Sequence, residues 1–225
     1  MDTDLNQHID ALIKSPATIR QIRFATDSRP ASGNVQKADF PRLDIMLDGQ
    51  LHDAGIKADP PVLSRHDVLF IHAGGWHSPR WQSPCTVLSI VFDKQQLELT
   101  LTRWNGSMLN VEERLQVPRR GPRTGSFLLQ ALNEMQMQPQ EQHTARYIVI
   151  SLLSHCADLL GSQVQTASRS QALFEAIRKY IDARFAEPLT RESVAQEFYL
   201  SPNYLSHLFQ KCCLLYTSPS PRDCS

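Results

Sequence analysis

The chain has 225 residues, of which 41% are hydrophobic and 20% charged, and its formal net charge at pH 7 is zero. Such a composition is typical of a folded globular protein with one large or two modest domains, and it excludes global disorder. Zero net charge also disfavours a protein that binds nucleic acids non-specifically through a basic surface, although a local basic patch can still bind DNA.

No apolar run approaches the ~20 residues that a membrane helix needs, so we expect no membrane span. Residues 1–5 lack the basic and apolar parts of a signal peptide, and we therefore expect a cytoplasmic protein. The five cysteines include no Cys-x-x-Cys pair, and we expect Cys85 and Cys156 to be buried, reduced thiols. Because no catalytic nucleophile motif, P-loop or dinucleotide fingerprint occurs, we expect neither an enzyme nor a cofactor.

Short strand-like segments follow an expected first helix at 4–14 and occupy roughly residues 18–118. Residues 19–24 alternate apolar and polar side chains, and Asp48-Gly49 is a turn signal. This succession predicts a small β-barrel or sandwich. The other expected strands lie at 42–47, 50–58, 68–71, 86–92 and 97–101.

Beyond residue 122 the pattern becomes helical. Residues 123–160 are expected to form a helical pair, whose second helix is apolar on more than one face and is therefore either buried or part of a dimer interface. Residues 161–170 are small and polar, and we interpret them as a linker.

Residues 171–211 are expected to form a first helix and then two short helices joined by a tight turn. The last helix would start at Ser201-Pro202, a hydroxyl cap followed by a proline at the first helical position. Its apolar face would carry Leu205, Leu208 and Phe209. The opposite face is polar, as a helix that reads a DNA major groove requires, and carries Asn203, Ser206, His207 and Gln210.

Two motifs in this region resemble the first helix-turn-helix unit of the AraC/XylS family of bacterial transcription regulators: Leu189-Thr190-x-Glu192-x-Val194-Ala195 and Leu200-Ser201-x-x-Tyr204-Leu205-Ser206-x-Leu208-Phe209-x-Lys211. The N-terminal half is similar to the cupin-like effector domain of that family. The residues that carry this similarity are Leu47-x-Gly49 and Asp67-Val68-Leu69-Phe70-Ile71-His72-Ala73-Gly74-x-x-His77. The resemblance implies an α+β chain: a cupin-like β-barrel domain at 1–122, then helices, then a partial all-α helix-turn-helix domain at 171–211.

The resemblance also implies roles for single residues. Ser206 and His207 would enter the major groove of double-stranded DNA, with Asn203 beside them. Ser201 and Lys211 would contact phosphates, which set the register of the protein on the duplex.

The segment 212–225 departs from the helical pattern and contains two Ser-Pro steps. It resembles a translated sequencing-adapter tail, so we expect it to be non-native. The family's second helix-turn-helix would then be absent and the chain a fragment. Residues 168–211 carry six basic and five acidic side chains, and we expect weak DNA binding from this fragment.

The histidines in the expected barrel suggest either a metal site or a binding site for a small molecule. Imidazole is a good metal ligand, but the sequence contains no His-x-His, and we expect no metal site. His72 and His77, with Trp76, are instead candidates for binding a small-molecule effector at the barrel mouth.

The leading hypothesis is a ligand-responsive, sequence-specific transcription regulator, with a homodimer formed through the helices at about 126–160. Two alternatives stay open. One is a cupin-type metalloenzyme with an appended helical tail, and the other is a small-molecule-binding module without a role on DNA.

Overall fold

The computed structural model describes residues 4–31, 33–57, 60–119, 123–184 and 188–216, without the side chains of 16, 163–168 and 211–216. The chain divides into two compact units, Met1–Leu160 and Gly161–Ser225. We call them the sheet unit and the helical unit. No helix in the described ranges is long and apolar enough to cross a membrane.

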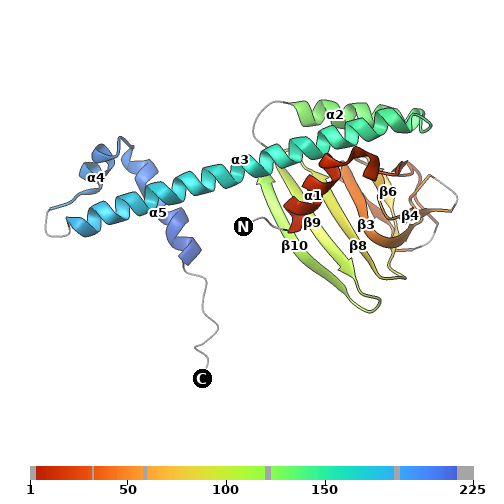
Figure 1. Ribbon diagram of the computed structural model, residues 1–225, viewed down its shortest axis with the longest axis horizontal. Helices are drawn as coiled ribbons and strands as arrows, with labels where there is room; N and C mark the ends of the chain where they lie inside the picture. The colour runs from red at the N-terminus through yellow and green to blue at the C-terminus, as the bar shows by residue number, and fades with distance from the viewer. Residues whose placement is uncertain (1–3, 32, 58–59, 120–122, 185–187, 217–225) are drawn as a thin grey trace, which may run out of the picture. The chain divides into compact units, whose positions relative to one another are not determined.

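Within the described residues of the sheet unit, eight strands form one mixed sheet (Figure 1). Its main path is β1-β5-β3-β8-β9-β10, in which β1 and β5 are parallel and the other neighbours antiparallel. β4 and β7 both pair with the second half of β3, and β2 and β6 form a separate ribbon. The strands are β1 (Gln21–Phe24), β2 (Gln36–Lys37), β3 (Arg42–Asp53), β4 (Val62–Ser64), β5 (Asp67–Ile71), β6 (Trp76–His77), β7 (Pro79–Arg80), β8 (Cys85–Phe92), β9 (Gln96–Trp104) and β10 (Leu109–Pro118).

The sheet is curled but is not the closed barrel that we expected. Along the described path the end strands β1 and β10 do not pair with each other. The curl comes from β3, whose register against β8 shifts between Met46 and Asp48 and whose Gly49 has a φ of 76°. Bulges and positive-φ glycines bend a strand, so the second half of β3 leaves β5 and pairs with β4 and β7.

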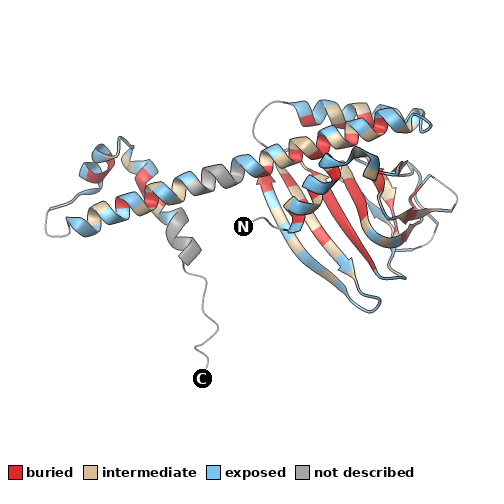
Figure 2. Ribbon diagram, viewed as in Figure 1, coloured by how far each residue is buried: buried red, intermediate tan, exposed pale blue. Residues whose placement is uncertain are grey.

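The two faces of the sheet enclose separate apolar clusters, as the alternation of side chains along a strand requires. In β5 Val68 and Phe70 belong to the cluster shared with the helices, whereas Leu69 and Ile71 belong to the cluster on the other face. The first cluster is covered by α1 (Asp4–Lys14), α2 (Thr124–Glu134) and the first part of α3 (Gln142–Ala183) (Figures 1 and 2). The helices expected at 123–160 therefore share the core of the sheet.

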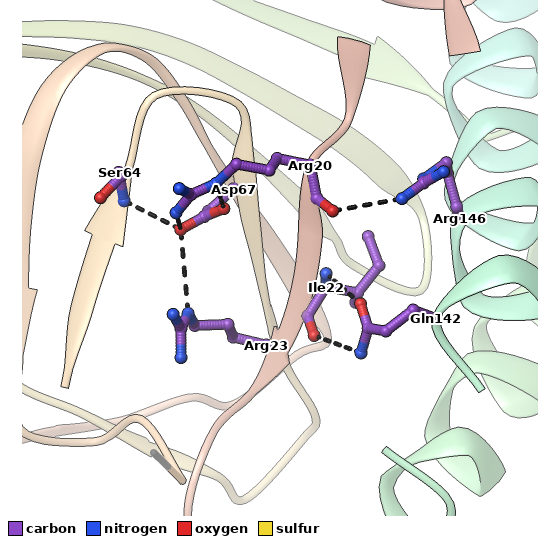
Figure 3. Close-up of polar contacts among 7 residues, drawn as sticks. All are labelled: Arg20, Ile22, Arg23, Ser64, Asp67, Gln142 and Arg146. Atoms are coloured by element: carbon purple, nitrogen blue, oxygen red, sulfur yellow. Dashed lines mark hydrogen bonds and ion pairs between the residues drawn. The ribbon is translucent and has the colours of Figure 1, made fainter. Parts of the chain in front are cut away.

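Polar contacts fasten the edge strand β1 to α3 and to β5 (Figure 3). The Gln142 side chain accepts from the Ile22 N–H at 2.8 Å and donates to the Ile22 carbonyl at 3.1 Å, so it satisfies backbone groups at the sheet edge. Asp67, which is fully buried, accepts two hydrogen bonds from Arg20, at 2.9 and 2.8 Å. Cys85 and Cys156 are buried and unpaired, as the sequence predicted.

Two helices extend further than the sequence suggested. α3 runs without interruption from Gln142 to Ala183, so residues 161–170, the expected linker, are helical. That segment contains no proline and one glycine, and its Ser, Gln and Ala residues are tolerated in a helix. α5 (Pro202–Tyr216) continues past Lys211, where we expected a break, because residues 212–216 contain neither glycine nor proline.

Candidate nucleic-acid interface

A small apolar core holds together the end of α3, α4 (Arg191–Glu197) and α5. The Phe174 and Phe209 rings meet edge to face with centroids 4.9 Å apart, and the Tyr180 and Phe198 rings do so at 5.4 Å. Ala195 is 1% exposed, which suits a small side chain where two helices cross closely. The buried members of this core are Phe174, Ile177, Val194, Ala195, Leu205 and Leu208.

The start of α4 is fixed by a reciprocal cap. The Thr190 hydroxyl accepts from the Ser193 N–H at 3.0 Å, and the Ser193 hydroxyl accepts from the Thr190 N–H at 2.9 Å. This satisfies two of the N–H groups that the first turn of a helix leaves free. α4 therefore begins at a defined residue although it is only seven residues long.

A tight turn joins α4 to α5. Tyr199 adopts a φ of 53°, in the left-handed region, and the Leu200 N–H donates to the Ala195 carbonyl at 2.8 Å. This is the geometry in which a residue with positive φ ends a helix. The Tyr199 side chain is 98% exposed, so the turn presents a phenol to solvent.

α5 begins at a second hydroxyl cap, because the Ser201 Oγ accepts from the Tyr204 N–H at 3.2 Å. Leu205 and Leu208 point into the core, whereas Asn203 and His207, one turn apart, are exposed. Gln210 is exposed as well and extends the same polar stripe.

Ser206 departs from the expected pattern. It is half-buried at the flank of the stripe, and its hydroxyl donates to the Pro202 carbonyl of its own helix at 3.2 Å. The Lys211 side chain lies outside the described residues.

Two exposed aromatic residues of α5 and the turn before it were given no role from the sequence: Tyr199, and Tyr204, which is 46% exposed and was quoted only as part of the motif. An aromatic residue is more often buried than exposed, and no sequence signal marks the left-handed turn at Tyr199. Arg191 pairs with its neighbour Glu192 at 2.9 Å, and this contact lowers the pKa of the Glu192 carboxyl.

The three effector candidates lie in the sheet unit and do not converge on one site. His72 Nε2 lies 2.9 Å from Asp27 Oδ1, and its side chain borders a cavity whose described lining includes neither Trp76 nor His77. Arg29 and Lys37 each lie 5.7 Å from the Trp76 ring centroid. His77 is 4% exposed, and burial lowers its pKa.

Within the described ranges no three His, Cys, Asp or Glu side chains are grouped so that they could hold a metal ion.

Two bacterial proteins are similar over most of this chain. The HTH-type transcriptional regulator YijO of Escherichia coli (strain K12) is 59% identical over 208 residues, which cover 92% of this chain and 72% of that protein. The HTH-type transcriptional regulator YpdC of the same strain is 34% identical over 202 residues, which cover 88% and 70%. No family model matches the chain, and no solved structure matches it. The capped helix pair and these two relatives lead to one conclusion: the chain belongs to the family of HTH-type transcriptional regulators.

Proposed function

We propose that the chain is a ligand-responsive regulator of the AraC/XylS type, in which α4 and α5 form the helix-turn-helix and α5 is the recognition helix. One observation carries this proposal: Asn203 and His207 are exposed on the side of α5 opposite Leu205 and Leu208. A recognition helix needs this division between a buried anchor and a free polar face.

The chemistry of the polar stripe suits base edges. An asparagine amide can pair with adenine N6 and N7, and imidazole can donate to or accept from a base edge. Gln210 extends the same face, and Ser206 keeps a lone pair free at its flank although its proton is used within the helix.

The residues at the helix ends suit the sugar-phosphate backbone. The Ser201 hydroxyl accepts from the Tyr204 N–H, so its own proton is free to bond a phosphate. Lys211 would supply a cation to a neighbouring phosphate, and the exposed Tyr199 phenol would donate to one.

DNA recognition is tested with duplexes selected by affinity from a random-sequence pool, with binding measured by fluorescence anisotropy at low salt. The double variant Asn203→Ala/His207→Ala should bind the selected duplex at least about tenfold more weakly, because each good base contact contributes about 1–3 kcal/mol. Lys211→Gln should weaken binding to all duplexes alike. It should also reduce, by about one, the slope of the logarithm of the binding constant against the logarithm of the salt concentration.

The matched control is Gln7→Ala, which removes an exposed polar side chain from α1, outside the proposed dimer surface. It should leave DNA binding unchanged. A folded double variant that binds the selected duplex as tightly as the parent chain would overturn the assignment of α5.

We also propose a homodimer formed through α2 and the first part of α3. Phe127 of α2, Tyr147 of α3 and Met137 in the turn between the two helices are 66%, 57% and 83% exposed, and exposed apolar side chains favour association. Light scattering tests this proposal, and a strict monomer at micromolar concentration would contradict it.

A further inference from the structure

A cavity of about 860 Å³ opens in the sheet unit, beside the end of β5, the end of β8 and the helices α2 and α3. We call it the α2–α3 cavity. Its volume lies in the range of small-molecule sites, about 300–1,000 Å³. It lies on the face of the sheet that the helices cover, because its floor residues Phe70, Phe92 and Leu129 belong to the shared helix–sheet core.

The floor of the cavity is apolar. Phe70, Phe92 and Leu129 are buried there, and the half-buried Phe40 and Leu159 form walls. Aromatic and aliphatic surfaces of this kind bury the apolar body of a ligand.

The rim carries cations. Lys94 and Arg123 are exposed and Arg119 is half-buried, while Asp39 is the carboxylate in the described lining. Within the described chain none of the three cations lies within 4.0 Å of a carboxylate oxygen. Their charge is therefore not neutralised by a direct ion pair.

Arg119 is held in place from two sides. Its Nη1 donates to the Asp93 carbonyl at 2.7 Å, and its guanidinium carbon lies 5.9 Å from the Phe92 ring centroid. Its Nη2 lies 3.4 Å from the Ser126 hydroxyl. Since a guanidinium has five N–H donors, it still has donors for a ligand.

The beginning of α2 adds a second feature that favours anions. Its N-cap residue, Arg123, makes no side-chain cap to the first-turn N–H groups. A Cβ at Gly125 would lie 2.8 Å from the His155 ring and 3.4 Å from Arg119 Nη2, so glycine lets the helix start approach both. A helix N-terminus next to arginines attracts negative charge.

We propose that the α2–α3 cavity binds an organic anion with an apolar body, whose acidic group lies against Arg119, Arg123 and the start of α2. The body packs on Phe70, Phe92 and Leu129. The inference that this anion is the regulatory ligand rests on the proposed function, whereas its binding to the cavity is measured without DNA.

The probe is 8-anilinonaphthalene-1-sulfonate, and its uncharged counterpart is N-phenyl-1-naphthylamine. The folded chain should bind one sulfonate probe, and Arg123→Gln should weaken that binding about tenfold or more. Lys94→Gln should weaken it severalfold. The matched control Arg103→Gln removes a charge that pairs with Glu112 outside the cavity, and it should bind the probe like the parent chain. The uncharged probe should not distinguish these proteins.

Competition separates the body of the ligand from its acidic group. Octanoate should displace the sulfonate probe, whereas inorganic phosphate at the same concentration should not. Equal binding of the sulfonate probe to Arg123→Gln and the parent chain, or equal displacement by phosphate, would overturn the proposal. If probe binding fails while Asn203→Ala/His207→Ala still weakens DNA binding, this inference falls and the proposed DNA recognition stands.

Discussion

In the sheet unit three carboxylates are buried, those of Asp44, Asp53 and Asp67, whereas every buried residue described in the helical unit is apolar. The buried carboxylates join segments far apart in the chain. Asp44 accepts from Arg42 and from Ser89, each at 2.6 Å, and so ties β3 to β8. Such networks stabilise one register of a sheet, because a shift of one strand along the other would leave a buried polar group without its hydrogen-bond partner.

The polar bonds described at the helix starts of the helical unit are local. Thr190 bonds Ser193, and Ser201 bonds Tyr204, three residues away in each case. The long-range stabilisation of this unit comes from its few apolar contacts. The helical unit therefore depends on a small apolar core rather than on a buried polar network, and that core should be sensitive to a single truncation.

The largest expected effect comes from Leu208→Ala, which opens a cavity in that core. The helical unit should lose about 3–4 kcal/mol of its free energy of unfolding. All three tryptophans, Trp76, Trp81 and Trp104, lie in the sheet unit. Urea unfolding followed by circular dichroism at 222 nm should therefore shift, while the tryptophan-fluorescence transition should not.

The matched control for this truncation is Leu109→Ala, at a side chain that is 44% exposed. It should change stability by less than about 0.5 kcal/mol. If the fluorescence transition moves together with the dichroism transition in Leu208→Ala, the two units unfold as one and the comparison fails.

The next effect concerns a buried carboxylate of the sheet unit. Burial raises the pKa of Asp53 to about 6 from an ordinary value of 3.8, although the Ser78 and Gly55 N–H groups donate to it at 2.6 and 2.7 Å. The folded chain then binds this proton more tightly than the unfolded chain. The contribution of Asp53 to stability is therefore full below about pH 4 and is lost as pH rises to about 6, by up to about 3 kcal/mol.

The measurement is urea unfolding of the parent chain and of Asp53→Asn, followed by tryptophan fluorescence between about pH 4 and pH 7. The variant cannot titrate at this position, so the stability of the parent relative to the variant should fall across that range. A difference that does not change with pH would show that Asp53 is not destabilised as a buried anion.

The smallest effect concerns the local cap of α4. Thr190→Ala removes the hydroxyl that accepts from the Ser193 N–H, and the helical unit should lose about 1 kcal/mol. Dichroism-detected urea unfolding measures this loss. Thr144→Ala, at an exposed position of α3, is the matched control and should be neutral or slightly stabilising. A loss in Thr190→Ala no larger than in the control would argue against the cap.

Much of the order of elements could be predicted from residue patterns, including the α+β class, because period-two and period-3.6 spacing are local signals. β10 was missed, although Asn105-Gly106 is a hairpin signal and the Asn105 side chain accepts from the Met108 N–H at 2.9 Å. That strand is an edge strand with mostly exposed or half-buried side chains, so its apolar pattern is weak.

The sequence by itself determined the caps at Thr190 and Ser201 and the division of α5 into a buried and a polar face. Those features depend on residues within one or two turns of each other. Only the tertiary structure decided that the sheet stays open along its described path, that residues 161–170 are helical, and that Arg119, Arg123 and His155 meet around one cavity. The pairing of distant strands and the packing of helices on a sheet depend on contacts between residues far apart in the chain, which no local pattern specifies.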